Sequence, residues 1–110
     1  MTKEETLQLV ERELARAQQA GMAGNEGMAR VCARRAAGAA IAYWLQFNSR
    51  PGWRADAVSR LRHLEADPSI PPQVREAAKR LAARVTEQFT SPYVSDPLVD
   101  TNVIIRHLLG

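Results

Sequence analysis

The fold is decided by residues 24–47, which read GNEGMARVCARRAAGAAIAYWLQF. This stretch has no proline, and residues 33–42 are almost entirely alanine, glycine and arginine. Alanine has the highest intrinsic helix propensity, so we predict a helix of roughly 20 residues, about 30 Å long. Gly38 costs roughly 1 kcal/mol of helix stability relative to alanine, but together with its alanine neighbours it keeps the helix thin. We therefore predict a central helix that neighbouring backbones approach closely.

One arginine of this helix falls on the face predicted to be apolar. At about 100° per residue, Arg35 lies among Met28, Cys32, Ala39 and Tyr43. Arg30 and Arg34 point the other way, and we expect them in solvent. A buried arginine needs a carboxylate partner, because an unpaired charge in apolar surroundings is very costly. Either Arg35 carries its guanidinium to the edge of the bundle, or it forms a buried pair or a ligand site.

The whole chain of 110 residues suits one domain covering residues 1–110. Its apolar content of 45% and charged content of 25% are ordinary for a globular protein. No apolar run reaches the roughly 18 residues of a membrane span, and the opening MTKEE does not resemble a secretory signal. Cys32 is the only cysteine, which excludes an internal disulfide. We expect a cytoplasmic protein with no membrane partner.

The net charge of +3 is unevenly distributed along the chain. Residues 1–29 hold three basic and five acidic side chains, residues 30–84 hold eleven and four, and residues 85–110 hold one and three. The basic middle segment could attract RNA, DNA or an acidic protein, or it could match the acidic ends of the same or another chain. A nucleic-acid face would gather on one side the cations Arg54, Arg60, Arg62, Arg75, Lys79 and Arg84.

Glycine, proline and serine divide the chain into helices. Breaks are expected at residues 21–24, 48–52, 67–71 and 90–95. The helices are predicted at about residues 3–20, 24–47, 53–66, 71–89 and 97–110. Thr2 with Glu5 fits a capping box, and Asp96 followed by Pro97 is a strong helix start. No stretch has a strand pattern, so we predict an all-α fold, an antiparallel bundle of four longer helices plus a short C-terminal helix.

The central helix resembles the small-residue second helix of HEPN-domain proteins. That helix follows a first, antiparallel helix and has the form Ala-Arg-x-x-Ala-x-x-Ala-Ala, which this chain matches with ARVCARRAA inside residues 24–45. The resemblance implies a bundle of four or five helices and frequent homodimers. It also implies roles in RNA cleavage, nucleotide binding or pairing with nucleotidyltransferases.

The chain departs from the HEPN pattern at the ribonuclease motif. Active HEPN ribonucleases share Arg-x-x-x-x-His on a late helix, but here Val58 stands five positions before His63, and Asn102 five before His107. We therefore predict that the protein does not cleave RNA. One cysteine and two distant histidines do not have the spacing of metal ligands. We predict that Cys32 is a small buried side chain. We assign no catalytic residue, no metal and no cofactor.

An excess of apolar side chains near the C-terminus predicts self-association. Residues 103–109 are too apolar to lie on one bundle and face water elsewhere. We predict a homodimer that buries at least about 1,000 Å², with Trp44, Ile104 and Leu108 as contacts. The alternative is that the last helix folds back and completes the core of its own chain.

Three functional classes remain, in the following order of preference. The first is a non-catalytic, HEPN-like helical interaction module that forms a homodimer or pairs with another protein. The second is an RNA- or DNA-binding protein that uses residues 30–84. The third is an enzyme whose site combines Arg35 with a carboxylate, so the sequence favours a non-catalytic role without deciding it.

Overall fold

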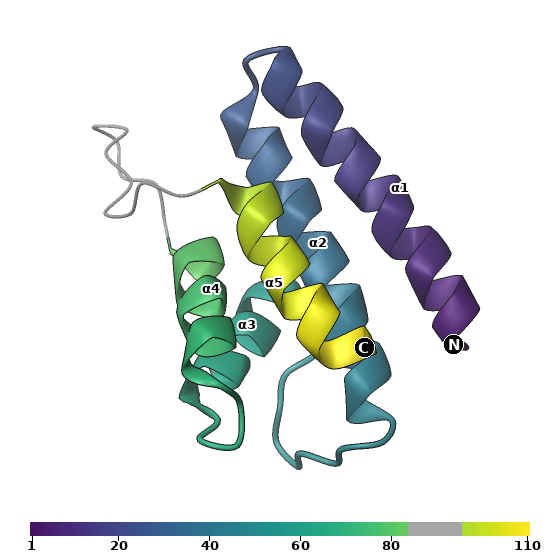
Figure 1. Ribbon diagram of the computed structural model, residues 1–110, viewed down its shortest axis with the longest axis vertical. Coiled ribbons are helices and arrows are strands. Elements are labelled where there is room, and N and C mark those ends of the chain that lie inside the picture. Colours follow the sequence, from purple (N-terminus) through teal and green to yellow (C-terminus); the bar gives the residue numbers. More distant parts are fainter. Residues whose placement is uncertain (84–95) are drawn as a thin grey trace.

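A computed structural model describes residues 1–83 and 96–110 (Figure 1). Its helices are α1 Lys3–Met22, α2 Glu26–Leu45, α3 Ala57–Ala66, α4 Pro72–Ala82 and α5 Pro97–Leu109. No strand occurs in these described residues, so the predicted all-α fold is confirmed for them. The fourth helix ends at Ala82, earlier than the predicted end near residue 89, because Ala83 is extended. The remainder of that predicted helix and the break predicted at residues 90–95 lie outside the described residues.

Polar side chains set where the helices begin. Thr2 and Glu5 form the predicted capping box at the start of α1. The side chains of Asn25, Asp56 and Asp96 each accept a backbone N–H in the first turn of α2, α3 and α5. These bonds satisfy amide groups that have no partner inside the helix. The local sequence therefore accounts for most of the helix starts.

The third helix begins later than the sequence predicted. We expected it at about Trp53, but Asp56 is the capping residue and Ala57 the first helical one. Trp53 lies in the preceding loop and packs on Trp44, with ring centroids 5.8 Å apart. A capping carboxylate is a stronger start signal than an apolar side chain, which explains the shift.

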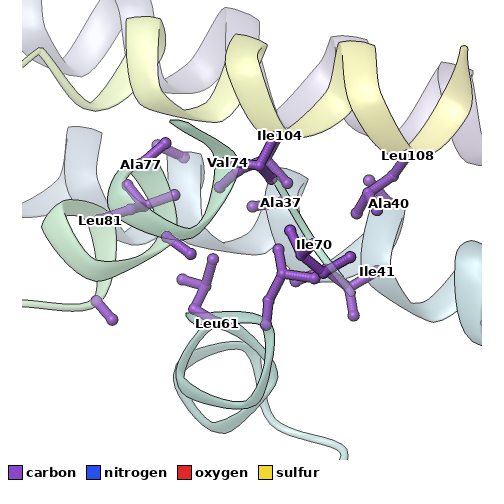
Figure 2. Close-up of a cluster of buried hydrophobic side chains, with 14 of the residues drawn as sticks. Ala37, Ala40, Ile41, Leu61, Ile70, Val74, Ala77, Leu81, Ile104 and Leu108 are labelled. Carbon is purple, nitrogen blue, oxygen red and sulfur yellow. The ribbon is translucent and has the colours of Figure 1, made fainter. Parts of the chain in front are cut away.

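The central position of α2 follows from its small side chains. It is the described helix that contacts all four others. Six of its nine buried residues are alanine or glycine, and Figure 2 shows Ala37 and Ala40 beneath larger side chains from α4 and α5. At Gly38 an added Cβ would lie 3.1 Å from the Cβ of Ala57 on α3. The predicted close approach of a neighbouring backbone is confirmed at this position.

The last helix completes the core of its own chain. Ile104 is fully buried and Leu108 nearly so, and Figure 2 shows both pointing from α5 toward α2. Their assignment as dimer contacts was wrong, because α5 lies against α2 and α4 and buries this apolar stripe itself. Trp44, the third predicted contact, is half-buried against Trp53. Self-association stays a prediction, without Ile104 and Leu108 as its contacts.

None of the helices in the described part of the chain is both long enough and apolar enough to cross a membrane.

Candidate functional site

The three arginines of α2 are arranged differently from the prediction. Arg30 is only 8% exposed and Arg34 is half-buried, whereas Arg35 is exposed. The expectation of solvated Arg30 and Arg34 was therefore wrong, and so was the alternative in which Arg35 is the buried cation. The reason is long-range: the end of α4 packs against the face of α2 that carries Arg30 and Arg34.

Arg30 and Arg34 close the C-terminal end of α4. Arg30 Nη2 donates to the carbonyl of Arg80. Arg34 donates from Nε to Leu81 at 2.8 Å and from Nη2 to Ala83 at 2.9 Å. The last carbonyls of a helix lack intrahelical donors and carry partial negative charge, so these cations stabilise the helix end. Burial, followed by the nearby cations, lowers the pKa of Arg34 from its ordinary value.

Other arginines of the basic middle segment also join parts of the chain. Arg75 Nε donates at 2.8 Å to a carbonyl in the last turn of α3. Arg80 pairs with the buried Asp100 of α5 at 3.0 Å. Arg50 pairs with Asp67 at 2.9 Å. Much of the positive charge in this segment therefore serves to hold helices together.

Part of the predicted nucleic-acid face comes together between α3 and α4. Arg62, Arg75 and Lys79 line a shared depression there, but Glu65 and Glu76 line it as well. The depression is therefore of mixed charge. Its carboxylates reduce the attraction that the cations would exert on a phosphate backbone.

The rest of that predicted face is elsewhere. Arg60 lines a different hollow, which residues of α1, α2 and α3 enclose. It donates a hydrogen bond to the carbonyl of Gly38 at 3.3 Å. Arg54 is exposed in the loop before α3. Arg84 lies outside the described residues. The structure thus brings together three of the six predicted cations.

The hollow that Arg60 lines differs from the mixed-charge depression between α3 and α4, and we call it the α2 groove. It has a volume of about 360 Å³ and follows α2 between α1 and α3, which do not contact each other. Its walls and floor include Thr6 and Leu9 of α1, Arg35, Ala39 and Ala42 of α2, and Ala57 and Arg60 of α3. A stretch of α2 with small side chains is therefore left uncovered.

The α2 groove combines an apolar surface with two cations. Arg35 and Arg60 are the charged side chains that line it, and none of the described lining residues is acidic. Arg35 has no hydrogen bond or ion pair to the described part of the chain. Arg60 donates from Nη1 to Gly38, but its buried Nε has no acceptor among the described residues. Exposed Arg35 therefore offers unused donors beside the apolar surface, and the buried Nε of Arg60 would gain an acceptor only if its guanidinium turned.

Exposed apolar side chains lie beside the groove, because Met1 lines it and Phe47 packs on the lining residue Tyr43. Phe47 is 70% exposed and packs on Tyr43, with ring centroids 5.2 Å apart. Met1 is 65% exposed and its carbonyl accepts a hydrogen bond from Gln46 of α2. Large apolar groups in water favour association with another surface.

The cysteine and the two histidines lie in three different surroundings. Cys32 is buried, and its pKa is raised by burial first and then by Glu13 of α1, so the thiol stays protonated at neutral pH. The prediction of Cys32 as a small buried side chain is confirmed. His63 stacks on Trp53 at 5.2 Å, and His107 is exposed. Within residues 1–83 and 96–110 no group of histidine, cysteine or carboxylate side chains could hold a metal.

Arg35 can be singled out from the sequence, but the groove around it cannot. The available signal was the run of small residues at Gly38, Ala39 and Ala42, on the same side of the helix as Arg35. Small residues usually indicate close packing, so this run alone does not indicate an open surface.

Comparison of the chain with known protein families, with curated proteins and with solved structures finds no match. The resemblance to HEPN-domain proteins therefore stays a prediction.

Proposed function

We propose that the protein is a non-catalytic helical interaction module that binds another protein in the α2 groove. The observation that carries this proposal is the uncovered stretch of α2 between α1 and α3. The central helix of a bundle is normally covered by its neighbours, and here its covering is incomplete next to exposed Phe47 and Met1.

The dimensions of the groove suit a short helical or extended segment. From Arg35 to Gln46 the helix rises about 17 Å, which is about three turns. The small side chains of Ala39 and Ala42 leave room for side chains of a partner. Amphipathic helices commonly bind other proteins by laying an apolar face into such a groove.

A nucleic-acid-binding role for residues 30–84 is the second candidate. It is favoured by the depression that Arg62, Arg75 and Lys79 line together. It ranks lower because Glu65 and Glu76 line the same depression, and Arg75 already donates to α3. If this candidate is right, RNA or DNA affinity should fall steeply between low and physiological salt, through counterion release.

A homodimer of HEPN type remains a further proposal. The outer face of α5 offers Val99, which is 58% exposed, in place of the buried Ile104 and Leu108. A contact there would leave the α2 groove free, so self-association and partner binding would be compatible.

The interaction role can be tested with a random library of helical peptides displayed on phage. Peptides would be selected on the wild-type protein and then tested on Ala39→Trp, which fills the groove. Ala15→Trp is the matched control, because Ala15 is exposed on α1 and does not line the groove. Both variants would first be checked for wild-type circular dichroism and melting.

We expect enriched peptides that bind the wild type and Ala15→Trp but not Ala39→Trp. Selection that yields no enriched peptide, or peptides that bind Ala39→Trp as well as the wild type, would contradict the proposal.

A further inference from the structure

We infer that the partner segment bound in the α2 groove is acidic, with a carboxylate held by Arg35 and Arg60 and apolar side chains resting on Ala39 and Ala42. This inference rests on the proposed function and names the chemistry of its partner. It follows from the charges that line the groove, the unused donors of Arg60, and the cost of placing a second copy there.

The charges of the groove select an anionic partner. Arg35 projects from α2 and Arg60 from α3, so the two cations approach the same hollow from neighbouring helices. None of the described lining residues neutralises them. A carboxylate can accept two parallel hydrogen bonds from a guanidinium, which makes this pairing stronger than a bond between neutral groups.

The hydrogen-bond donors of the Arg60 guanidinium are poorly satisfied within the described part of the chain. Its hydrogen bond to the carbonyl of Gly38 is long at 3.3 Å, and its Nε is buried without an acceptor among the described residues. A buried donor without a partner is unfavourable. Turning the guanidinium toward an incoming carboxylate would give up one weak bond and satisfy stronger ones.

The apolar part of the groove distinguishes a peptide from a simple anion. Ala39 and Ala42 lie one turn and two turns beyond Arg35 on the same side of α2. An amphipathic helix that presents a carboxylate and, four and seven positions away, apolar side chains would match this spacing. A free anion would gain nothing from the alanine surface.

A second copy of the chain does not fit this face. A two-fold contact through the groove would bring Arg35 and Arg60 of one copy against the same arginines of the other. Like charges at an interface are destabilising. A head-to-tail contact would need an acidic surface of the same chain, but α1 carries four acidic and three basic side chains and so offers little charge complementarity. We therefore take the partner to be a different protein.

The test uses the peptides that the library selection enriches for groove-dependent binding. We expect these peptides to be rich in glutamate or aspartate beside an apolar stripe. The tightest binder and its Glu→Lys counterpart would be titrated against wild type, Arg35→Glu and Arg54→Glu. Arg35 is the residue to change first because it is exposed, whereas replacing Arg60 also removes its bond to Gly38.

The acidic peptide should bind Arg35→Glu at least about tenfold more weakly than the wild type, since a charge-assisted bond of this kind is worth about one decade in affinity. The Glu→Lys peptide should prefer Arg35→Glu. Arg54→Glu, which changes the same charge outside the groove, should retain wild-type affinity within about twofold.

Each outcome separates the two proposals. Groove-dependent peptides without acidic residues, or equal affinity of the acidic peptide for wild type and Arg35→Glu, would overturn the inference and leave the interaction role standing. An equal loss in Arg54→Glu would mean that net charge acts rather than the groove, and would also overturn it. The absence of any groove-dependent peptide would overturn both.

Discussion

Arg34 Nε lies 2.8 Å from the carbonyl oxygen of Leu81, a bond that joins the middle of α2 to the last turn of α4. The next residue, Arg35, faces the α2 groove and bonds to nothing in the described chain. Adjacent helical residues diverge by about 100°, so the two arginines reach different surfaces. One therefore stabilises the fold, and the other is available for binding.

This difference predicts opposite effects of two matched substitutions. Arg34→Met should lower the free energy of unfolding by about 2 kcal/mol, because it removes two charge-assisted bonds from the end of α4. Arg35→Met should change it by less than about 0.5 kcal/mol, as expected for an exposed residue. Urea unfolding followed by circular dichroism measures both. Equal losses in the two variants would contradict the assignment.

The effect of Gly38→Ala on stability should depend on Ala57, the residue of α3 that faces Gly38. Gly38→Ala improves helix propensity but places a Cβ 3.1 Å from the Cβ of Ala57, so we expect a net loss of stability of about 1 kcal/mol. An Ala57→Gly background removes the Cβ contact but leaves the Cα of residue 57 at 3.3 Å, so Gly38→Ala should be less destabilising there than in the wild type. Urea unfolding of the four proteins gives the coupling free energy. Additive effects would show that the close approach does not matter.

Asp67 should contribute to stability in a defined range of pH. Its carboxylate accepts hydrogen bonds from Ser69 and from Arg50, and these lower the pKa of Asp67 from 3.8 to about 2. Because the folded pKa lies below the unfolded one, the stabilisation is complete above about pH 4 and disappears as the pH falls toward 2.

Asp67→Asn should therefore cost about 1 kcal/mol at pH 7, reduced from the full linkage value by solvent screening. The wild type and the variant should converge in stability near pH 2. Urea titrations at several pH values between 7 and 2 follow this convergence. A difference that is independent of pH would refute the electrostatic explanation.

Ile104 should behave as a core residue. Ile104→Asp buries a carboxylate against α2 and α4 and should remove most of the helical circular dichroism. Val99→Asp, on the exposed face of the same helix, should leave the fold intact. Light scattering of the folded variants then reports self-association. A folded Ile104→Asp protein that only dissociates from dimer to monomer would restore the discarded dimer contact.

Much of the fold could be predicted because its signals are local. The capping box at Thr2 and Glu5, the Asp96-Pro97 start and the alanine-rich central stretch each act over a few residues. The start of α3 was placed too early because the apolar Trp53 was taken into the helix, although Asp56 supplies the cap.

The site was harder to predict because it depends on residues far apart in the sequence. Which arginine of α2 is buried depends on where the end of α4 packs, about 50 residues later. The apolar stripe of α5 has the same sequence pattern whether its own chain or a second chain covers it. In the structure, Ile104 is buried in the core of its own chain. The α2 groove exists because α1 and α3 stay apart on either side of α2, and no local pattern encodes that separation.

Amide chemical-shift mapping of the labelled protein with the tightest library peptide shows directly whether the α2 groove is the binding surface. We expect the largest shifts on the groove residues Leu9, Arg35, Ala39, Ala42 and Arg60. Largest shifts at Arg62, Arg75 and Lys79, between α3 and α4, would contradict it.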